Sequence, residues 1–161
     1  MTTTRSAWGT LKTGSPRRAT PLVGGTGPKV FQDVQAFLDV AIHCSSSVLI
    51  SGGELRVRRM LARCIHQESG RQDGPFVVVD YRGVPDAFLT SSLGSIFLED
   101  VDALSPEAQA RMVAVFTRRL PGETHMRVIA GASYDLPDLV RAGDFSADLF
   151  GLLSALHLVI G

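Results

Sequence analysis

Short apolar runs alternate with helix-like segments from Val30 onward, and this alternation constrains the fold more than any other feature of the chain. The runs are short, and several are rich in β-branched residues, as buried strands are. They lie at 48–50, 76–80, 96–100, 128–130 and 155–160. Because parallel strands need crossover helices between them, the sequence predicts a three-layer α/β/α sandwich with a five-stranded parallel sheet.

Helical spacing of apolar side chains predicts the segments between the strands. Helices are expected at 31–43, 55–66 and 106–119, with two short ones near 136–141 and 147–153. The clearest start is Ser105-Pro106-Glu107. There the serine can cap the helix, the proline fits its first turn and the glutamate complements its dipole.

Length and composition allow a single core. With 161 residues, 45% of them hydrophobic, the chain can bury one ordinary domain. Residues 1–28 are predicted to be a disordered basic tail and residues 29–161 the domain. Residues 1–32 carry five basic and no acidic side chains, whereas residues 33–161 hold all 16 acidic against 11 basic ones, a net charge of −5. The charge density of the tail is too low to indicate nucleic-acid binding.

The composition also excludes some environments and sites. No apolar run approaches the roughly 20 residues of a membrane span, and the N-terminus lacks the apolar core of a signal peptide. We therefore expect a cytoplasmic protein without a membrane partner. Cys44 and Cys64 are interpreted as buried small hydrophobic residues. No metal site is expected, because no cysteine or histidine has a neighbour at metal-ligand spacing.

Residues 51–59, Ser-Gly-Gly-Glu-Leu-Arg-Val-Arg-Arg, follow the first predicted strand, where a phosphate-binding loop of the form GxxxxGK[ST] would lie. Gly52 keeps the first glycine. Val57, Arg58 and Arg59 take the positions of the second glycine, the lysine and the magnesium-binding hydroxyl. A β-branched valine resists the positive φ that glycine allows, and a planar guanidinium is a poor substitute for a compact ammonium. The simpler interpretation is a strand-to-helix connection that binds no nucleotide.

Four long segments resemble, in order and spacing, the AAA+ domain of bacterial enhancer-binding proteins, the NtrC-like activators of sigma-54 RNA polymerase. They are VLISGGELRVRRMLARCIH, GPFVVV, SIFLEDVDALSPEAQARMVAVF and RVIAGASYDLPDLVRAGDFSADLFGLLSAL. The resemblance covers residues 30–161. It implies an AAA+ or P-loop NTPase-like core with the strand order 5-1-4-3-2 and, in this chain, no helical lid.

The resemblance also places departures at the positions that carry ATPase chemistry in that family. Glu99-Asp100 reverses the Walker B order, in which Asp holds a magnesium-bound water and Glu polarises the attacking water. Ser133 matches the sensor asparagine, and Ser146 and Leu152 match the arginine fingers. Loss of a finger alone costs about 10³–10⁵ in rate in related phosphoryl transfer. The degenerate nucleotide-site positions are therefore Gly52, Gly53, Val57, Arg58, Arg59, Glu99, Asp100, Ser133, Ser146 and Leu152.

Segments that the family uses to reach other molecules have no counterpart in the sequence. The family's insertion with the GAFTGA loop, which touches sigma-54, is missing where Leu93 runs into Gly94-Ser95-Ile96. The helical lid and the DNA-binding helix-turn-helix have no matching residues either. The resemblance thus implies no sigma-54 contact through such a loop and no direct DNA binding.

Together these observations predict a non-catalytic pseudo-AAA+ protein-interaction module with no ATP or magnesium cofactor. It would be a regulator related to sigma-54-dependent transcription that contacts an AAA+ activator or self-assembles. A candidate partner face is formed by Arg56, Arg59 and Arg63 on one side of a predicted helix, although such faces are usually solvated.

Two alternatives retain a ligand at the degenerate site. The first is a residual ATP-binding or weak ATPase domain that uses Glu99, Asp100 and Arg58. The second keeps a nucleotide or another phosphorylated ligand without hydrolysis, held by Arg58 and Arg59. Against the second alternative, we expect both arginine side chains to point into water.

Overall fold

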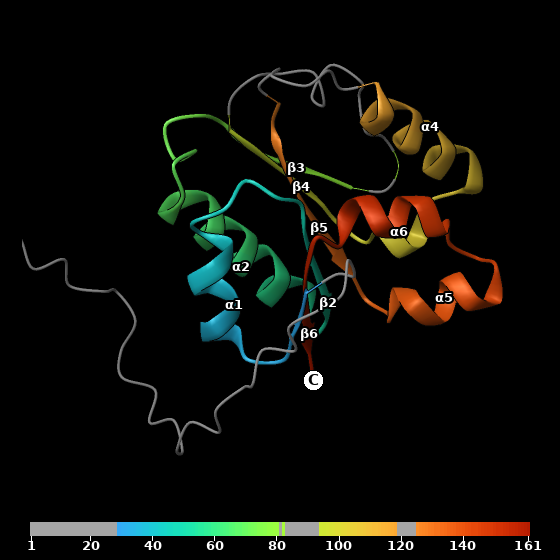
Figure 1. Cartoon of the computed structure of the whole chain (residues 1–161), viewed down its shortest axis with the longest axis horizontal. Helices are drawn as coiled ribbons and strands as arrows, with labels where there is room; N and C mark the ends of the chain where they lie inside the picture. The colour runs from blue at the N-terminus through green and yellow to red at the C-terminus, as the bar shows by residue number, and fades with distance from the viewer. Residues whose placement is uncertain (1–28, 81, 83–93, 119–124) are drawn as a thin grey trace, which may run out of the picture.

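A computed structural model describes residues 29–80, 82, 94–118 and 125–161 and shows a parallel β-sheet with helices on both faces (Figure 1). The predicted tail lies outside these residues, as do residues 83–93 directly before Gly94. No helix within the described ranges is long and apolar enough to cross a membrane. The strands are β1 Lys29–Phe31, β2 Val48–Gly52, β3 Phe76–Val79, β4 Ser95–Leu98, β5 Arg127–Ala132 and β6 Leu156–Ile160. The helices are α1 Val34–Ala41, α2 Leu55–Glu68, α4 Pro106–Thr117, α5 Leu136–Ala142 and α6 Ala147–Leu153, with a 3-10 turn, η1, at Val101–Ala103.

The sheet has six parallel strands in the order β1-β6-β2-β5-β4-β3. The predicted order of five strands is confirmed, and the predicted strand count is wrong by one. The extra strand, β1, pairs with β6 in the register Lys29 to Leu156. Phe31, which we expected in a helix, belongs to this strand, because Asp33 caps α1 by accepting a hydrogen bond from the Ala36 amide.

Two apolar cores lie on opposite faces of the sheet, and the side chains of each strand alternate between them. In β2, Leu49 packs toward α4, α5 and α6, whereas its neighbours Val48 and Ile50 pack toward α1 and α2. In β5, Ile129 faces α1 and α2 and Val128 faces the other core. Figure 1 shows the same division, with α1 and α2 on one side and α4, α5 and α6 on the other. The three-layer prediction is confirmed.

The carboxyl ends of the parallel strands meet at one edge of the sheet, which brings distant segments together. β4 ends at Leu98, so Glu99 and Asp100, which we expected inside this strand, lie just beyond it. The Glu99 amide still bonds to the Val79 carbonyl. Asp100 then adopts a left-handed conformation with φ 48° and turns the chain into η1. This turn places both carboxylates in the loop region rather than in the ladder.

Gln109 fastens α4 to the segment that precedes α6. Its side chain is buried, and Nε2 donates to the Leu104 carbonyl at 3.0 Å and the Asp144 carbonyl at 3.3 Å. Its Oε1 accepts from the Ser146 amide at 2.7 Å. The amide therefore satisfies three backbone groups that have left regular secondary structure.

Replacing Gln109 with methionine should lower the free energy of unfolding by about 2 kcal/mol, because it leaves these backbone groups without a partner. Urea denaturation measures the loss. The matched control is Gln35→Met on the exposed side of α1, where the glutamine bonds to the exposed Asp39 side chain. We expect this control to stay within about 0.5 kcal/mol of the parent, and equal losses for the two variants would contradict the role of Gln109.

Candidate functional site

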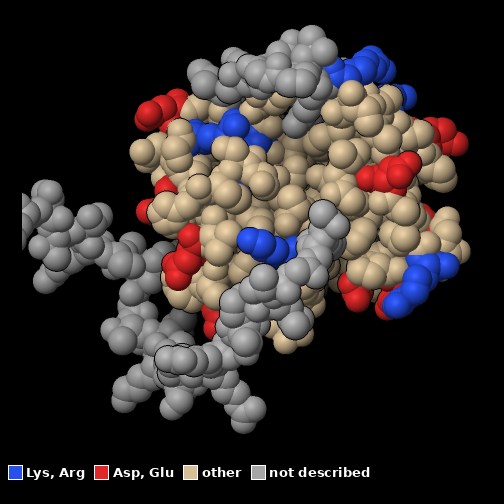
Figure 2. All heavy atoms as spheres, viewed as in Figure 1, with Lys and Arg blue, Asp and Glu red and all other residues tan. Residues whose placement is uncertain are grey.

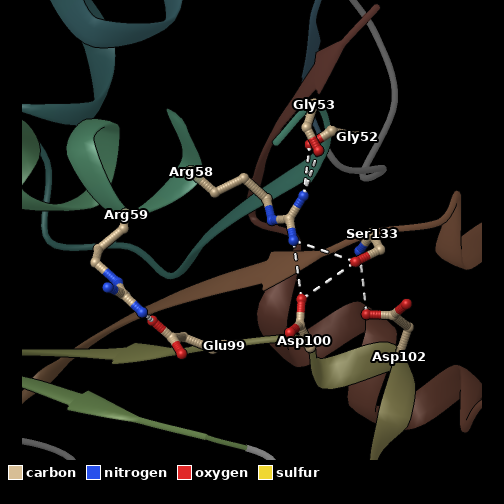
Figure 3. Close-up of polar contacts among 8 residues, drawn as sticks. All are labelled: Gly52, Gly53, Arg58, Arg59, Glu99, Asp100, Asp102 and Ser133. Atoms are coloured by element: carbon tan, nitrogen blue, oxygen red, sulfur yellow. Dashed lines mark hydrogen bonds and ion pairs between the residues drawn. The ribbon is translucent and has the colours of Figure 1, made fainter. Parts of the chain in front are cut away.

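A compact polar cluster lies at the carboxyl edge of the sheet, and its residues come from the ends of three neighbouring strands and from one helix (Figure 3). Gly52 ends β2 and is followed by Gly53, Asp100 follows β4, and Ser133 follows β5. Arg58 reaches the cluster from the first turns of α2. The sequence predicted these positions as one degenerate site, and the structure brings these five residues together.

Arg58 lies at the centre of this cluster, and its side chain is only 2% exposed. Nη1 donates to the Gly52 carbonyl at 2.9 Å and to the Gly53 carbonyl at 2.6 Å. Nη2 donates to Asp100 Oδ1 at 2.8 Å and to Ser133 Oγ at 3.1 Å. The expectation that Arg58 points into water is wrong, because both of its Nη atoms donate to acceptors within the chain, although its buried Nε has no partner among the described residues.

The glycine loop presents two acceptors to the centre of the site, the Gly52 and Gly53 carbonyl oxygens. Loops that bind phosphate direct backbone N–H groups inward, whereas here two carbonyl oxygens point at a cation. The amides of Val57 and Arg58 are also occupied, since both donate to the Glu54 carbonyl in the first turn of α2. Two carbonyl oxygens of the loop therefore hold a positive charge, and Arg58 supplies it.

The positive φ angles of this loop fall at Gly52, 80°, and Gly53, 62°. Val57 instead lies within α2 and packs against the core between the sheet and α1 and α2. Our expectation that a valine at position 57 would meet a demand for positive φ is therefore not fulfilled. Valine in place of the second glycine of the GxxxxGK[ST] pattern is therefore compatible with the helix.

Asp100 and Ser133 complete the cluster with a hydrogen-bond chain. Ser133 Oγ donates to Asp100 Oδ1 at 3.2 Å, and the Ser133 amide donates to Asp102 Oδ1 at 3.1 Å. We did not predict a role for Asp102. Its spacing in Glu-Asp-Val-Asp was the available signal, because a carboxylate two residues beyond Asp100 falls in the same turn.

Arg59 and Glu99 form a second ion pair beside the first. Nε and Nη2 of Arg59 lie 2.7 and 2.5 Å from Glu99 Oε1. The glutamate side chain is 11% exposed and that of the arginine 46%. Arg59 is thus also paired instead of pointing freely into water. Glu99, at the position where the resemblance places the aspartate that holds a magnesium-bound water, is paired with this arginine.

The three arginines of the candidate partner face each have a partner within the chain. Arg56 pairs with Glu54 at 2.8 Å, Arg59 with Glu99, and the Arg63 guanidinium lies 5.5 Å from the centre of the Phe76 ring. Figure 2 shows the charged side chains of the described residues in small separate groups on the face drawn. A partner docking on these arginines would have to exchange existing contacts.

The two positions matched to arginine fingers have structural contacts on α6. Ser146 caps this helix by accepting from the Leu149 amide at 3.2 Å. Leu152 is partly buried against the core beneath α4, α5 and α6. Neither side chain takes part in the cluster around Arg58.

Two buried histidines, His66 and His157, make the stability of the folded state depend on pH. Ser51 Oγ and His157 Nε2 lie 2.5 Å apart between β2 and β6, and His66 Nδ1 lies 3.1 Å from Ser95 Oγ. Burial lowers the pKa of His157, with Asp135 opposing the shift. Burial also lowers the pKa of His66, with the backbone at Gly74 opposing it.

Stability should therefore fall as the pH drops below about 6.5, the ordinary histidine pKa. In that range the unfolded chain binds protons that the folded histidines do not, so protonation favours unfolding. Urea denaturation between pH 7.5 and 5.5 measures the slope. His157→Gln removes one titrating group and should flatten this slope, and a slope unchanged in the variant would contradict the assignment.

The family is decided by a match of residues 26–161, most of the chain, to the sequence model of the sigma-54 interaction domain. The chain belongs to the sigma-54 interaction domain family. Related proteins include the DNA-binding transcriptional regulator NtrC of Bradyrhizobium sp. (strain RP501 Parasponia), 26% identical over 170 residues, which cover 86% of this chain and 35% of NtrC. The regulatory protein AtoC of Escherichia coli (strain K12) is 27% identical over 147 residues, 71% of this chain and 32% of AtoC. This sigma-54 interaction domain thus spans about a third of the length of these relatives.

Solved structures show the same fold. NtrX from Brucella abortus in complex with ATP has a TM-score of 0.64 at 24% identity, over 79% of this chain and 36% of that one. The P-loop NTPase domain of the sigma-54 transport activator from E. coli has a TM-score of 0.61 at 20% identity, over 79% of this chain and 99% of that one. The sigma-54 interaction domain described here therefore has the AAA+ P-loop NTPase fold.

Proposed function

We propose that this sigma-54 interaction domain is a non-catalytic pseudo-AAA+ module. It regulates sigma-54-dependent transcription through contact with an AAA+ activator or with copies of itself. The observation that carries the proposal is the Arg58 guanidinium, which bonds to two loop carbonyls, Asp100 and Ser133 in the place where phosphates would need to bind. Neither ATP nor magnesium has a role in the proposed function.

The energetics of the cluster favour this proposal over residual ATP binding. Phosphates could enter only after Arg58 had left its acceptors, and hydrogen bonds to charged groups contribute roughly 1.5–3 kcal/mol each. Loss of two such bonds weakens binding roughly 100-fold or more, since every 1.4 kcal/mol is tenfold. Magnesium would also have to displace Arg58 from Asp100 or Arg59 from Glu99. Weak hydrolysis through these carboxylates therefore requires the rearrangement of both ion pairs.

Isothermal titration with ATP and ADP in the presence of magnesium tests the loss of nucleotide binding. We expect no saturable heat at ligand concentrations in the micromolar range. The NtrX protein from Brucella abortus, which was solved in complex with ATP, is the positive control. Saturable binding by the present chain in this range would overturn the non-catalytic assignment.

Analytical ultracentrifugation tests the interaction role separately. The chain is run alone over a concentration series and then mixed with an AAA+ activator from the same genome. We expect either a concentration-dependent self-association or a new species that contains both proteins. If the chain neither self-associates nor forms a complex with the activator, the interaction role is refuted. The result of the nucleotide titration would be unaffected.

A further inference from the structure

A buried cation lies at the opposite end of the sheet from the Arg58 cluster. Arg127 begins β5, and the residue is 2% exposed. Its Nε donates to the Ser46 carbonyl at 3.1 Å, and its Nη2 lies 3.6 Å from Cys44 Sγ. Nη1 is buried and has no hydrogen-bond partner among the described residues. A guanidinium with an unpaired donor is costly to bury, so an acceptor oxygen added beside it would stabilise the site.

Arg127 has no ion pair with a carboxylate within the described residues. Burial lowers the pKa of the Arg127 guanidinium, the Cys44 sulfur opposes that shift, and the Arg71 guanidinium adds to it. Arg71 is itself bonded to the Gly94 and His125 carbonyls. The sulfur of Cys44 is thus the group that offsets a locally positive environment.

Cys44 is half-buried in the connection between α1 and β2, so a small reagent can reach it. The Cys44 sulfur lies 3.8 Å from the Ala41 carbonyl oxygen and 3.6 Å from the Arg127 guanidinium. That guanidinium can donate to an oxygen added to the sulfur, and hydrogen bonds from charged donors are roughly twice as strong as neutral ones. We propose that Cys44 is a redox-modification site, at which a hydroperoxide oxidises the sulfur to a sulfenic acid whose oxygen bonds to the Arg127 guanidinium. This site is independent of the proposed function.

The chemistry balances without a further reactant. The Cys44 thiolate attacks one oxygen of the hydroperoxide, an S–O bond forms and the O–O bond breaks. The sulfur is oxidised by two electrons, and the departing oxygen leaves as hydroxide or alkoxide and takes a proton from water. The new oxygen is an acceptor beside a guanidinium that has an unused donor.

Cys64 provides a control within the same molecule. This second free thiol lies on α2 and is also half-buried. Burial raises the pKa of the Cys64 thiol, and the Glu68 carboxylate adds to the shift. The two cysteines therefore differ in the sign of the neighbouring charge more than in their access to solvent.

The test exposes the folded chain of 161 residues to hydrogen peroxide at pH 7 with a dimedone probe and measures labelling of each cysteine by peptide mass spectrometry. We expect Cys44 to be labelled about tenfold faster than Cys64, because one hydrogen bond from a charged donor to the developing oxygen is enough for a roughly tenfold effect. We also expect Cys44 to react faster in the folded chain than in urea, where both thiols lose their neighbours. A folded-state rate for Cys44 equal to or below either reference would overturn the proposal.

A variant then assigns the effect to the guanidinium. Arg127→Gln should lower the Cys44 rate to about that of Cys64 while the Cys64 rate stays unchanged. If this variant does not fold, the comparison with urea still decides. A folded Arg127→Gln protein whose Cys44 reacts at the parent rate would refute the role of Arg127.

Discussion

Replacing Gly52 with alanine is expected to lower the free energy of unfolding by about 4 kcal/mol, combining a backbone penalty with displacement of packed atoms. Gly52 has φ 80°, where an L-residue costs roughly 1–2 kcal/mol. A Cβ at this position would also lie 2.2 Å from the Ile160 carbonyl oxygen, so the end of β6 would have to move. The strain would act on the strand pair that supports the glycine loop.

Urea denaturation with two glycine controls tests this prediction. At Gly53, φ is 62°, and the nearest atom to an added Cβ is the flexible Ile160 side chain at 3.0 Å, so alanine there should cost less. At Gly151, in α6, nothing lies within 4 Å of an added Cβ, and alanine should be neutral or stabilise by up to about 1 kcal/mol. A loss for Gly52→Ala no greater than that for Gly53→Ala would contradict the observed approach of β6.

Arg58→Met should lower the free energy of unfolding by about 3 kcal/mol. Methionine keeps much of the apolar stem but leaves two loop carbonyls without the guanidinium donor and Asp100 without its ion pair, although the Ser133 hydroxyl still donates to Asp100. Breaking a buried ion pair from one side costs about 3–5 kcal/mol. The lower end applies here, since the Asp100 side chain is 32% exposed and water can solvate part of it.

The control for Arg58 is Arg56→Met, two residues earlier on the same helix. Arg56 also pairs with a carboxylate, Glu54, but its side chain is 87% exposed. Exposed pairs contribute about 0–1 kcal/mol, so this variant should stay near the parent. In a double-mutant cycle, Arg58→Met and Asp100→Asn should be less destabilising together than the sum of the two single changes. A loss below about 1 kcal/mol for Arg58→Met would mean that the cluster does not stabilise the fold.

Periodicity predicted the layers and five strands because each strand has a continuous apolar run and each helix an apolar stripe. The sixth strand, Lys29–Phe31, was missed for a physical reason. It has three residues, pairs with β6 alone at the edge of the sheet, and Val30 is 59% exposed. A segment of this kind has no alternation to detect, and its pairing depends on where β6 lies.

The sequence predicted where the site lies in the fold but not which way the Arg58 side chain points within it. The ends of parallel strands converge, so Gly52, Asp100 and Ser133 could be grouped from sequence. The direction of the Arg58 side chain could not, because hydropathy predicts an exposed arginine and the acceptors that bury it come from three separate strand ends. The burial of Arg127 could not be predicted from hydropathy either.

The occupancy of a site by a molecule that exchanges with solution depends on the concentration of that molecule, because binding follows mass action. The guanidinium between Gly52 and Asp100 belongs to the polypeptide and cannot dissociate, so its occupancy is set when the chain folds. Under the proposed function, the first turns of α2 would keep one conformation at high and at low cellular concentrations of ATP. Such a subunit would be insensitive to the ratio of ATP to ADP.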